Sequence, residues 1–450
     1  MAKRYLIETF GCQMNFHDSE RMAGLLEAAG YEAAVDAAEA DVIVLNTCTV
    51  RVKAEDKVFS RIGDLRAAAQ SRGADPIVAV AGCLAQQEGA AIFRRSPFVD
   101  VVVGTQAEKR LPVLIDAAAR TSVRQIDVNP YDDVSFPLGM ARRTEPVKAY
   151  VTIIEGCNDF CAFCVVPRTR GHERMRPKSD ILAEVHEAVA SGRTEVQLLG
   201  QIVNHYQAPD DNRCDFAGLL EAVNDVPGIR RIRFASPHPR HVSPRLVEAI
   251  RDLPRVCKHL HLPVQSGSTR ILSAMRRRHT RGDYLDLVAR LKDHIPGIQL
   301  STDMIVGFPG ESGQDFDDTL SLVEAVRFHS MFSFKYSERP DTLAARRLRD
   351  DVAEEEKTRR LASLQDRQKA VQTALHEQAV GTSVEVLVDS VSRRRETELS
   401  GRTSGNTVVN FPGQASQLGC LVTVTIERSG PHSVWGRIDA LTEADEPPTL

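Results

Sequence analysis

Three cysteines lie close together in the middle of the chain, as Cys157, Cys161 and Cys164 with the spacing CxxxCxxC. Thiolates are soft ligands of the kind that iron–sulfur clusters and zinc prefer. A zinc site would usually be completed by a fourth Cys or His, and nothing in the spacing pairs His172, the nearest histidine, with this loop. The spacing therefore predicts a four-iron cluster that is held by three cysteines and keeps one iron open.

Three further cysteines are far apart in the sequence but share a position relative to the expected strands. Cys12, Cys48 and Cys83 each come directly after a short apolar run that is typical of a buried strand. Because the carboxyl ends of parallel strands meet at one edge of a sheet, where ligands bind, we expect these thiols to converge on a second cluster. The other three cysteines show no such placement and are interpreted as structural: Cys214, Cys257 and Cys420.

Three other residues occupy positions suited to a cofactor pocket. Phe163 directly precedes the last cysteine of the central loop, which resembles the radical S-adenosylmethionine signature with its aromatic residue at that position, while Gly200 and Gln265 follow expected strands. Active sites of βα barrels lie at the carboxyl ends of the strands, and glycine there lets the backbone approach a ligand closely. We predict that these three residues and the cysteines of the central loop contact the cofactor, and we assign no catalytic residue beyond the cluster ligands.

The hydrophobic pattern divides the chain into three regions of an α/β protein. Residues 3–120 alternate strands with helices, which predicts an open parallel α/β sheet. Residues 143–375 repeat this alternation six times, which predicts a partial (βα)6 barrel, and a polar stretch at 129–146 precedes it as a linker. Residues 378–445 contain short β-branched runs separated by turns, which predicts a small antiparallel β-barrel of the size that often binds oligonucleotides.

Composition limits the location and the partners of the chain. The formal net charge of -4 argues against binding nucleic acid by overall charge alone, although Arg276–Arg278 and Arg393–Arg395 could form local contacts or simply be solvated. An odd count of nine cysteines is a poor disulfide framework. Because no apolar run approaches the ~20 residues of a membrane span and the N-terminus has no secretory core, we expect a cytoplasmic protein without membrane contact, and a monomer by default.

Several motifs resemble the methylthiotransferase family of radical S-adenosylmethionine enzymes. The strand-end cysteines stand in Gly11–Asn15, Asn46–Arg51 and Gly82–Gln87, which are similar to the N-terminal domain of that family. The resemblance continues through its radical core and its RNA-binding TRAM domain, in these segments: Val103–Gln106, Glu155–Gly171, Ser236–Pro239, His261–Ser268, Gly401–Thr403 and Val409–Phe411. The residues after Cys12, Gln13-Met14-Asn15, favour the members that act on N6-dimethylallyladenosine.

The resemblance implies two [4Fe-4S] clusters and S-adenosyl-L-methionine as cofactors. One molecule of the cofactor would give a radical at the cluster of Cys157, and a second would give the methyl group. The cluster of Cys12 would bind or supply sulfur. The product would carry a methylthio group on C2 of the dimethylallyladenosine at position 37 of tRNA. The implied partners are the tRNA anticodon stem-loop, a sulfur donor and a reductant protein such as flavodoxin or ferredoxin.

Two other interpretations remain open at this point. A methylthiotransferase could instead act on threonylcarbamoyl-adenosine in tRNA or on a ribosomal protein. A chain with two iron–sulfur clusters and an RNA-binding tail could also be an electron carrier. A carrier gains nothing from an open iron and would more often use four cysteines for each cluster. The C2–H bond of an adenine ring is unreactive toward polar reagents, which favours a radical reaction. The base would have to leave its stack in the RNA to reach an enzyme pocket.

Overall fold

The computed structural model describes residues 2–49, 52–73, 75–129, 141–392 and 397–440. Much of the predicted linker at 129–146 and all of Arg393–Arg395 lie outside these ranges. The chain folds into two compact units: Met1–Thr144 with Ile154–Asp159 and Val165–Arg176, and Glu145–Ile153 with Phe160–Cys164 and Pro177–Leu450. The three-region boundaries at 3–120, 143–375 and 378–445 remain predictions.

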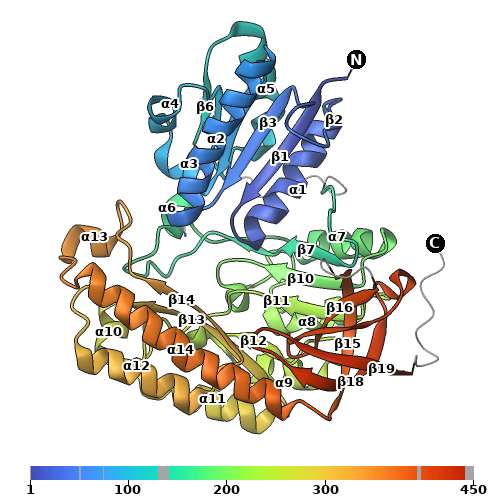
Figure 1. The fold of residues 1–450 in the computed structure, drawn as a ribbon, viewed down its shortest axis with the longest axis vertical. Coiled ribbons are helices and arrows are strands. Elements are labelled where there is room, and N and C mark those ends of the chain that lie inside the picture. Colours follow the sequence, from blue (N-terminus) through green and yellow to red (C-terminus); the bar gives the residue numbers. More distant parts are fainter. Residues whose placement is uncertain (1, 50–51, 74, 130–140, 393–396, 441–450) are drawn as a thin grey trace. The chain divides into compact units, whose positions relative to one another are not determined.

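The first unit contains a six-stranded sheet in which every neighbouring pair is parallel, in the order β2-β1-β3-β4-β5-β6 (Figure 1). This confirms the open parallel α/β sheet. The strands are β1 (Arg4–Phe10), β2 (Glu32–Ala33), β3 (Val42–Thr47), β4 (Ile77–Gly82), β5 (Val101–Val103) and β6 (Gln125–Asp127). The helices are α1 (Gln13–Ala28), α2 (Val52–Arg72), α3 (Cys83–Glu88), α4 (Ala91–Arg95), α5 (Leu111–Thr121) and the short α6 (Val166–Thr169), with a two-stranded ribbon of β8 (Ile154–Glu155) and β9 (Arg174–Met175).

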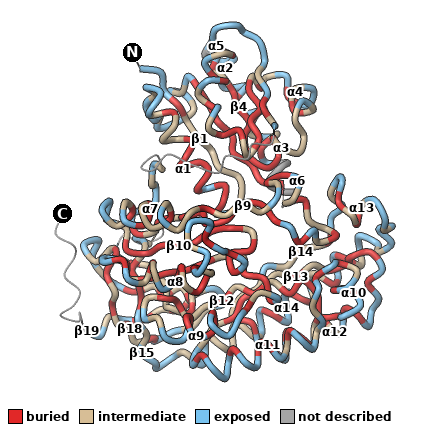
Figure 2. The backbone as a smooth tube through the Cα atoms, turned by 180° about the vertical axis from the view of Figure 1, so that it is seen from behind, coloured by how far each residue is buried: buried red, intermediate tan, exposed pale blue. Residues whose placement is uncertain are grey.

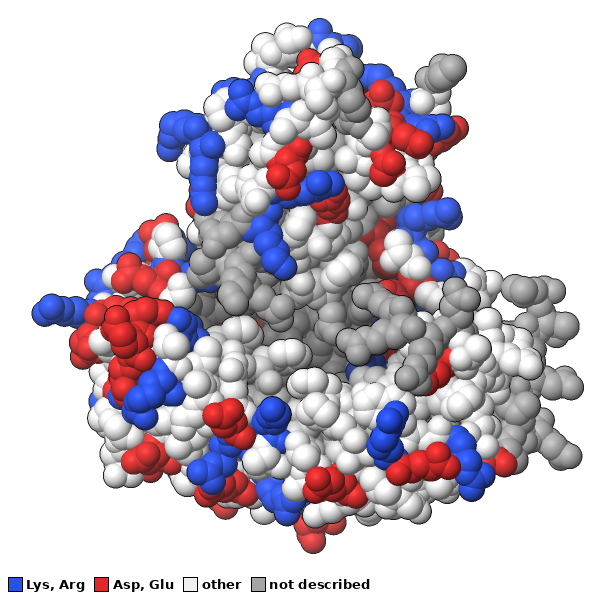
Figure 3. Space-filling model, in the orientation of Figure 1, with Lys and Arg blue, Asp and Glu red and all other residues white. Residues whose placement is uncertain are grey.

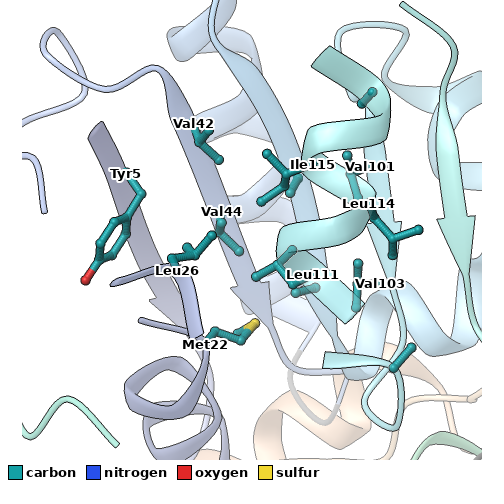
Figure 4. Packing of buried hydrophobic residues seen from close by; sticks show 14 residues of the cluster. Tyr5, Met22, Leu26, Val42, Val44, Val101, Val103, Leu111, Leu114 and Ile115 are labelled. Atoms are coloured by element: carbon teal, nitrogen blue, oxygen red, sulfur yellow. The ribbon is translucent and has the colours of Figure 1, made fainter. Parts of the chain in front are cut away.

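Apolar side chains on both faces of the central strands hold this sheet to its helices. Every residue of β3 is buried, as expected of a parallel strand that helices cover on two sides. The neighbouring strand β4 is buried along most of its length (Figure 2). Figure 4 shows one of the two cores, in which Met22 of α1 and Leu111 of α5 pack near Val44. The other core uses Ile62 of α2. The sheet edge that carries the strand-end cysteines therefore rests on a well-packed support.

The second unit begins with six parallel strands in two neighbouring sheets, β7-β10-β11 and β12-β13-β14. A parallel bridge between Ile232 and Val256 continues the series from one sheet to the next, which confirms the partial (βα)6 barrel. The strands are β7 (Lys148–Thr152), β10 (Glu195–Leu199), β11 (Arg231–Phe234), β12 (His259–His261), β13 (Gln299–Val306) and β14 (Ser330–Lys335). The helices are α7 (Lys178–Ala190), α8 (Phe216–Asn224), α9 (Pro244–Asp252), α10 (Thr269–Ala274), α11 (Arg281–His294), α12 (Gly313–Val326) and α13 (Leu343–Arg347).

A long helix, α14 (Glu354–Gln378), leads from these strands to a closed five-stranded barrel in the order β15-β16-β17-β19-β18. Its strands are β15 (Ser383–Val391), β16 (Glu398–Thr403), β17 (Val408–Pro412), β18 (Leu421–Ser429) and β19 (Val434–Ala440). The small β-barrel is confirmed with one correction, because β17 and β19 pair in parallel. Five strands in a closed ring cannot all alternate in direction, so at least one neighbouring pair must be parallel.

Charged side chains of both signs are interspersed on the surface that Figure 3 shows, in keeping with the small net charge. Within the described ranges, no helix combines the length and the apolar character that a bilayer crossing requires.

Candidate functional site

The structure brings the three strand-end cysteines together at one edge of the first unit's sheet. Phe10, Thr47 and Gly82 form one row across the neighbouring strands β1, β3 and β4. Cys12 and Cys48 follow this row, and Cys83 opens helix α3 just after it. The thiol of Cys48 forms hydrogen bonds with the other two thiols. Their convergence follows from the parallel order of the strands, as strand-end placement predicts.

Hydrogen bonds within this trio lower the pKa of two of its thiols. Donation from Cys48 lowers the pKa of Cys12 to about 6 and that of Cys83 to about 7, and the positive charge of Arg170 acts in the same direction. Hydrogen bonds to the other two thiols, together with burial, raise the pKa of Cys48. The charge of Arg170 thus favours the thiolate, which is the form of cysteine that binds metal.

Two asparagines hold the loops that carry these cysteines. The Oδ1 atom of Asn15 accepts hydrogen bonds from the backbone N and the Sγ of Cys12, both at 3.3 Å. The side chain of Asn15 donates to Asn46 Oδ1 at 3.2 Å, and Asn46 Nδ2 donates back to the Asn15 carbonyl at 2.8 Å. Both asparagines are fully buried. Both lie in segments that resemble the family. In the structure, their hydrogen bonds fix the loops that follow β1 and β3.

Gly82 permits the close approach of the loops, and its substitution tests that packing. Its φ of 87° and ψ of -156° belong to a region that essentially only glycine adopts, and a Cβ there would lie 2.3 Å from Asn46 Oδ1. We expect Gly82→Ala to lower the free energy of unfolding by about 3 kcal/mol, the sum of backbone strain and overpacking. Chemical denaturation of the metal-free protein measures this loss.

Gly30 offers a matched control for this substitution. Its φ is also 87°, but nothing lies within 4 Å of the position of its missing Cβ. Gly30→Ala should therefore cost only the backbone term, about 1 kcal/mol. Equal losses for the two variants would contradict the crowding described at Gly82.

A buried ionic group lies beside the strand-end thiols and was missed by the sequence analysis. Arg170 is 5% exposed and donates to Asp18 Oδ2 at 2.5 Å. The charge of Arg170 acts on both Cys12 and Cys83. Glu108 is buried near the same pair, burial raises its pKa, and its Oε1 finds no hydrogen-bond partner among the described residues. A guanidinium in this position compensates part of the negative charge that a thiolate-bound cluster would bring into the protein.

Cys157 belongs to the same compact unit as Arg170. The backbone N of Cys157 donates to the carbonyl of Gly171 at 3.1 Å, and the N of Asp159 donates to the Sγ of Cys157 at 3.5 Å. A Cβ at Gly156 would lie 2.0 Å from the His172 carbonyl oxygen, so this turn requires glycine. His172 lies close to this loop through a contact with Asn158 rather than with a cysteine, because its Nδ1 lies 2.9 Å from Asn158 Oδ1.

The second unit carries Cys161 and Cys164 next to a buried arginine. The N of Cys164 donates to the Cys161 carbonyl at 3.0 Å. Arg277 is 6% exposed, and it directs Nη1 to Cys161 Sγ at 3.6 Å and Nη2 to the Pro263 carbonyl at 2.6 Å. Arg276–Arg278 therefore does not form one exposed basic run: its middle residue points inward while its two flanking residues are exposed.

The contact between Arg277 and Cys161 allows a prediction about the reduction potential of a cluster at this loop. Hydrogen bonds to cluster sulfurs help to set the reduction potential, and loss of such partners often costs about 10- to 100-fold in activity. We expect Arg277→Met to lower both the potential of the cluster at this loop and the rate of cofactor cleavage. Redox titration followed by electron paramagnetic resonance checks the potential.

Arg277→Lys is the control for charge at this position. It retains the positive charge without the planar pair of donors that reaches both Cys161 and Pro263. We expect an intermediate loss of activity. An unchanged potential in the Met variant would show that this hydrogen bond does not influence the cluster.

The remaining sequence-predicted cofactor residues fall into different environments. Phe163 packs against a buried apolar cluster of the second unit that includes Met275 and Phe308, so it also anchors the loop. Gly200 is buried at the carboxyl end of β10. Gln265 adopts a φ of 82°, and its backbone N donates to the Asp303 carbonyl at 3.0 Å. A buried residue other than glycine in that conformation is characteristic of functional sites.

The strand-end thiols fit the ligand chemistry of an iron–sulfur cluster. Within the described part of the chain, no group of three or more His, Cys, Asp or Glu side chains has the arrangement of a metal-ion site. A four-iron cluster differs because each cysteine binds a different iron. At the strand-end site, the buried hydroxyls of Thr47 and Thr49 find no hydrogen-bond partner among the described residues. They flank Cys48 and could donate to a cluster. The other cysteines, at 214, 257 and 420, are buried away from any such set.

Three family models match the chain, one for each predicted region. Uncharacterized protein family UPF0004 matches residues 4–104, the Radical SAM superfamily matches residues 151–323, and the TRAM domain matches residues 377–438. The first match contains all three strand-end cysteines, and the second contains the CxxxCxxC loop.

Curated relatives cover nearly the whole chain. The tRNA-2-methylthio-N(6)-dimethylallyladenosine synthase of Thiobacillus denitrificans is 47% identical over 437 residues, which are 96% of this chain and 98% of the relative. That of Nitrosospira multiformis is 46% identical, over 97% of this chain and 93% of the relative. The chain belongs to this family of synthases. It is therefore a radical S-adenosylmethionine enzyme of the tRNA methylthiotransferase class.

Solved structures support the fold. The radical S-adenosylmethionine methyltransferase TsrM from Kitasatospora setae, with cobalamin and a [4Fe-4S] cluster bound, superposes with a TM-score of 0.55 at 15% identity, over 77% of this chain and 74% of that one. At this identity the likeness concerns the fold alone.

Proposed function

We propose that this chain catalyses the radical methylthiolation of C2 of N6-dimethylallyladenosine at position 37 of tRNA. The family and its 46–47% identity over nearly the full length carry the proposal. The two cysteine sets also support it. C2 of adenine is unreactive toward polar reagents, so the reaction needs a site that generates a radical as well as a source of sulfur. A separate sulfur site and a separate radical site match the two parts of the reaction. The alternative substrates are threonylcarbamoyl-adenosine in tRNA and a ribosomal protein.

The cofactors are assigned residue by residue. Cys157, Cys161 and Cys164 would hold one [4Fe-4S] cluster, and Cys12, Cys48 and Cys83 a second. When bound, the first cluster and S-adenosyl-L-methionine supply a 5′-deoxyadenosyl radical. Phe163, Gly200 and Gln265 would contact that cofactor.

The chain's own residues prepare both sites for these groups. The lowered pKa values of Cys12 and Cys83 favour the thiolate form in which they would bind metal. Arg170 balances charge at the strand-end site. Arg277 donates to Cys161 and fixes it against the Pro263 carbonyl.

The tRNA is the macromolecular partner in this proposal, and the barrel of β15–β19 with its TRAM match supports it. That barrel is tied to the parallel strands of its own unit. Arg233 donates to the Thr403 carbonyl at 2.8 Å, and Lys258 N donates to Ser404 Oγ at 2.8 Å. Further elements of the proposal are a reductant protein such as flavodoxin or ferredoxin, a sulfur donor, a monomeric enzyme and a cytoplasmic location.

Nucleoside analysis of tRNA tests the substrate. A strain without this gene should accumulate dimethylallyladenosine that lacks the methylthio group, and the wild-type gene should restore the modification. An unchanged nucleoside profile, or a change confined to threonylcarbamoyl-adenosine, would overturn the assignment.

A further inference from the structure

Three residues on neighbouring strands of the second unit share one face of the sheet β12-β13-β14. His261 is in register with Ser301, and Asp303 is in register with Phe332. Because side chains alternate along a strand, His261, Asp303 and Phe332 project to the same side. These residues come from three different strands, so the fold alone gathers them.

That side is the inner face of the partial barrel. Thr302, between Ser301 and Asp303, bonds through its hydroxyl to the Leu262 carbonyl, as does Tyr284 of helix α11. Ser333, next to Phe332, accepts a hydrogen bond from Gln365 of helix α14. The alternate residues therefore face the helices, which lie along one side of these strands in Figure 1. The remaining side faces the interior of the partial barrel, and His261 is the last residue of β12, at the carboxyl end where βα barrels place their active sites.

The three side chains form a connected polar and aromatic group. His261 Nδ1 lies 2.9 Å from Ser301 Oγ, and its Nε2 lies 3.4 Å from Asp303 Oδ1. The Phe332 ring meets the His261 ring edge-on, with centroids 6.1 Å apart. Phe332 is nevertheless 54% exposed. Ligand pockets are lined by apolar and aromatic side chains with a few placed polar groups. An exposed phenylalanine on an inner face, beside a carboxylate that a histidine positions, fits this description.

We propose that His261, Asp303 and Phe332 form the pocket for the prenylated adenine, an inference that rests on the proposed function. In dimethylallyladenosine an apolar five-carbon chain is attached to N6, which retains one N–H. Asp303 would accept a hydrogen bond from that N–H, and Phe332 would cover the prenyl chain next to it. His261 positions the carboxylate and contributes ring surface. Threonylcarbamoyl-adenosine fits this pocket poorly, because it brings a second carboxylate to Asp303 and a polar group to Phe332.

Substrate discrimination tests this pocket. The ratio of kcat/KM for tRNA that carries dimethylallyladenosine to kcat/KM for tRNA that carries unmodified adenosine measures recognition of the prenyl group. We expect Phe332→Ala to reduce this ratio by about 10- to 100-fold, as expected for the loss of contact with several methyl and methylene groups. We expect Asp303→Asn to lower kcat/KM for the prenylated tRNA about tenfold, with a smaller change in the ratio.

Ser333→Ala is the matched control, because Ser333 lies on the same strand and faces helix α14. It should leave the ratio unchanged. All variants should bind S-adenosylmethionine with the wild-type affinity, as measured by equilibrium binding to the reconstituted enzyme. A Phe332→Ala variant with an unchanged ratio would overturn the pocket, and weakened cofactor binding would instead assign these residues to the cofactor. If the wild-type enzyme fails to modify prenylated tRNA, the proposed function itself is wrong.

Discussion

Replacing Cys12, Cys48 and Cys83 together with alanine is expected to abolish methylthiolation of tRNA while cleavage of S-adenosylmethionine continues. The three thiols meet at one sheet edge of the first unit and share hydrogen bonds. In the proposed function they would hold the sulfur-transfer cluster, whereas the radical would be generated at the cysteines of the CxxxCxxC loop. The wild-type protein should contain about eight irons after anaerobic reconstitution and the variant about four.

Iron analysis and the detection of 5′-deoxyadenosine check this result. Cys214→Ala is the control for the loss of a thiol, because Cys214 is buried and lies in no cysteine set. It should retain all the iron and most of the activity. If the triple variant retained its full iron content, the strand-end cysteines would not be cluster ligands.

Replacing Cys157, Cys161 and Cys164 together with alanine is expected to stop both reactions. In the proposed function these thiols would hold the cluster that cleaves the cofactor, so neither 5′-deoxyadenosine nor the methylthio product should form without them. The strand-end cluster should remain and leave about half of the iron. Loss of cleavage at half iron distinguishes this variant from the preceding one, which has the same iron content but retains cleavage.

Circular dichroism checks whether both triple variants still fold. The strand-end thiols lie next to a core that does not depend on them, since Met22, Val44 and Leu111 pack within the sheet and its helices. Both variants should therefore retain the wild-type helix content. Continued cofactor cleavage in the Cys157, Cys161 and Cys164 variant would exclude these residues as the radical site.

The sequence allowed the strand-end site to be predicted because a simple rule connects strand order with ligand position. Cys12, Cys48 and Cys83 are far apart in the chain, yet each follows a buried parallel strand, and the strands β1, β3 and β4 are neighbours. The six barrel strands could be predicted because each corresponds to a short apolar run that is bounded by turns. Helix α1 begins at Gln13, because Cys12 and Asn15 form a capping box at its start.

Residues whose role depends on distant partners could not be predicted in this way. Arg170 reaches Asp18 across 152 positions of sequence. Arg277 has two arginine neighbours in the sequence, so the composition of the segment indicated an exposed basic run rather than a buried donor to Cys161. The inner-face group of Phe332 was missed because an aromatic residue in an apolar strand is ordinarily part of the core. Only the register of β13 and β14 shows which side it occupies.

The position of β14 has a consequence for how substrate choice can evolve. Among the described strands, β14 pairs with β13 alone, so one of its edges has no neighbouring strand that must adjust to a change. Phe332 lies on this strand with more than half of its surface exposed, and its replacement would leave the buried core of the enzyme untouched. The strand-end cysteines, in contrast, follow three different strands of the first unit's central sheet. Related enzymes could thus acquire new substrates by drift at this edge while they inherit the same radical chemistry unchanged.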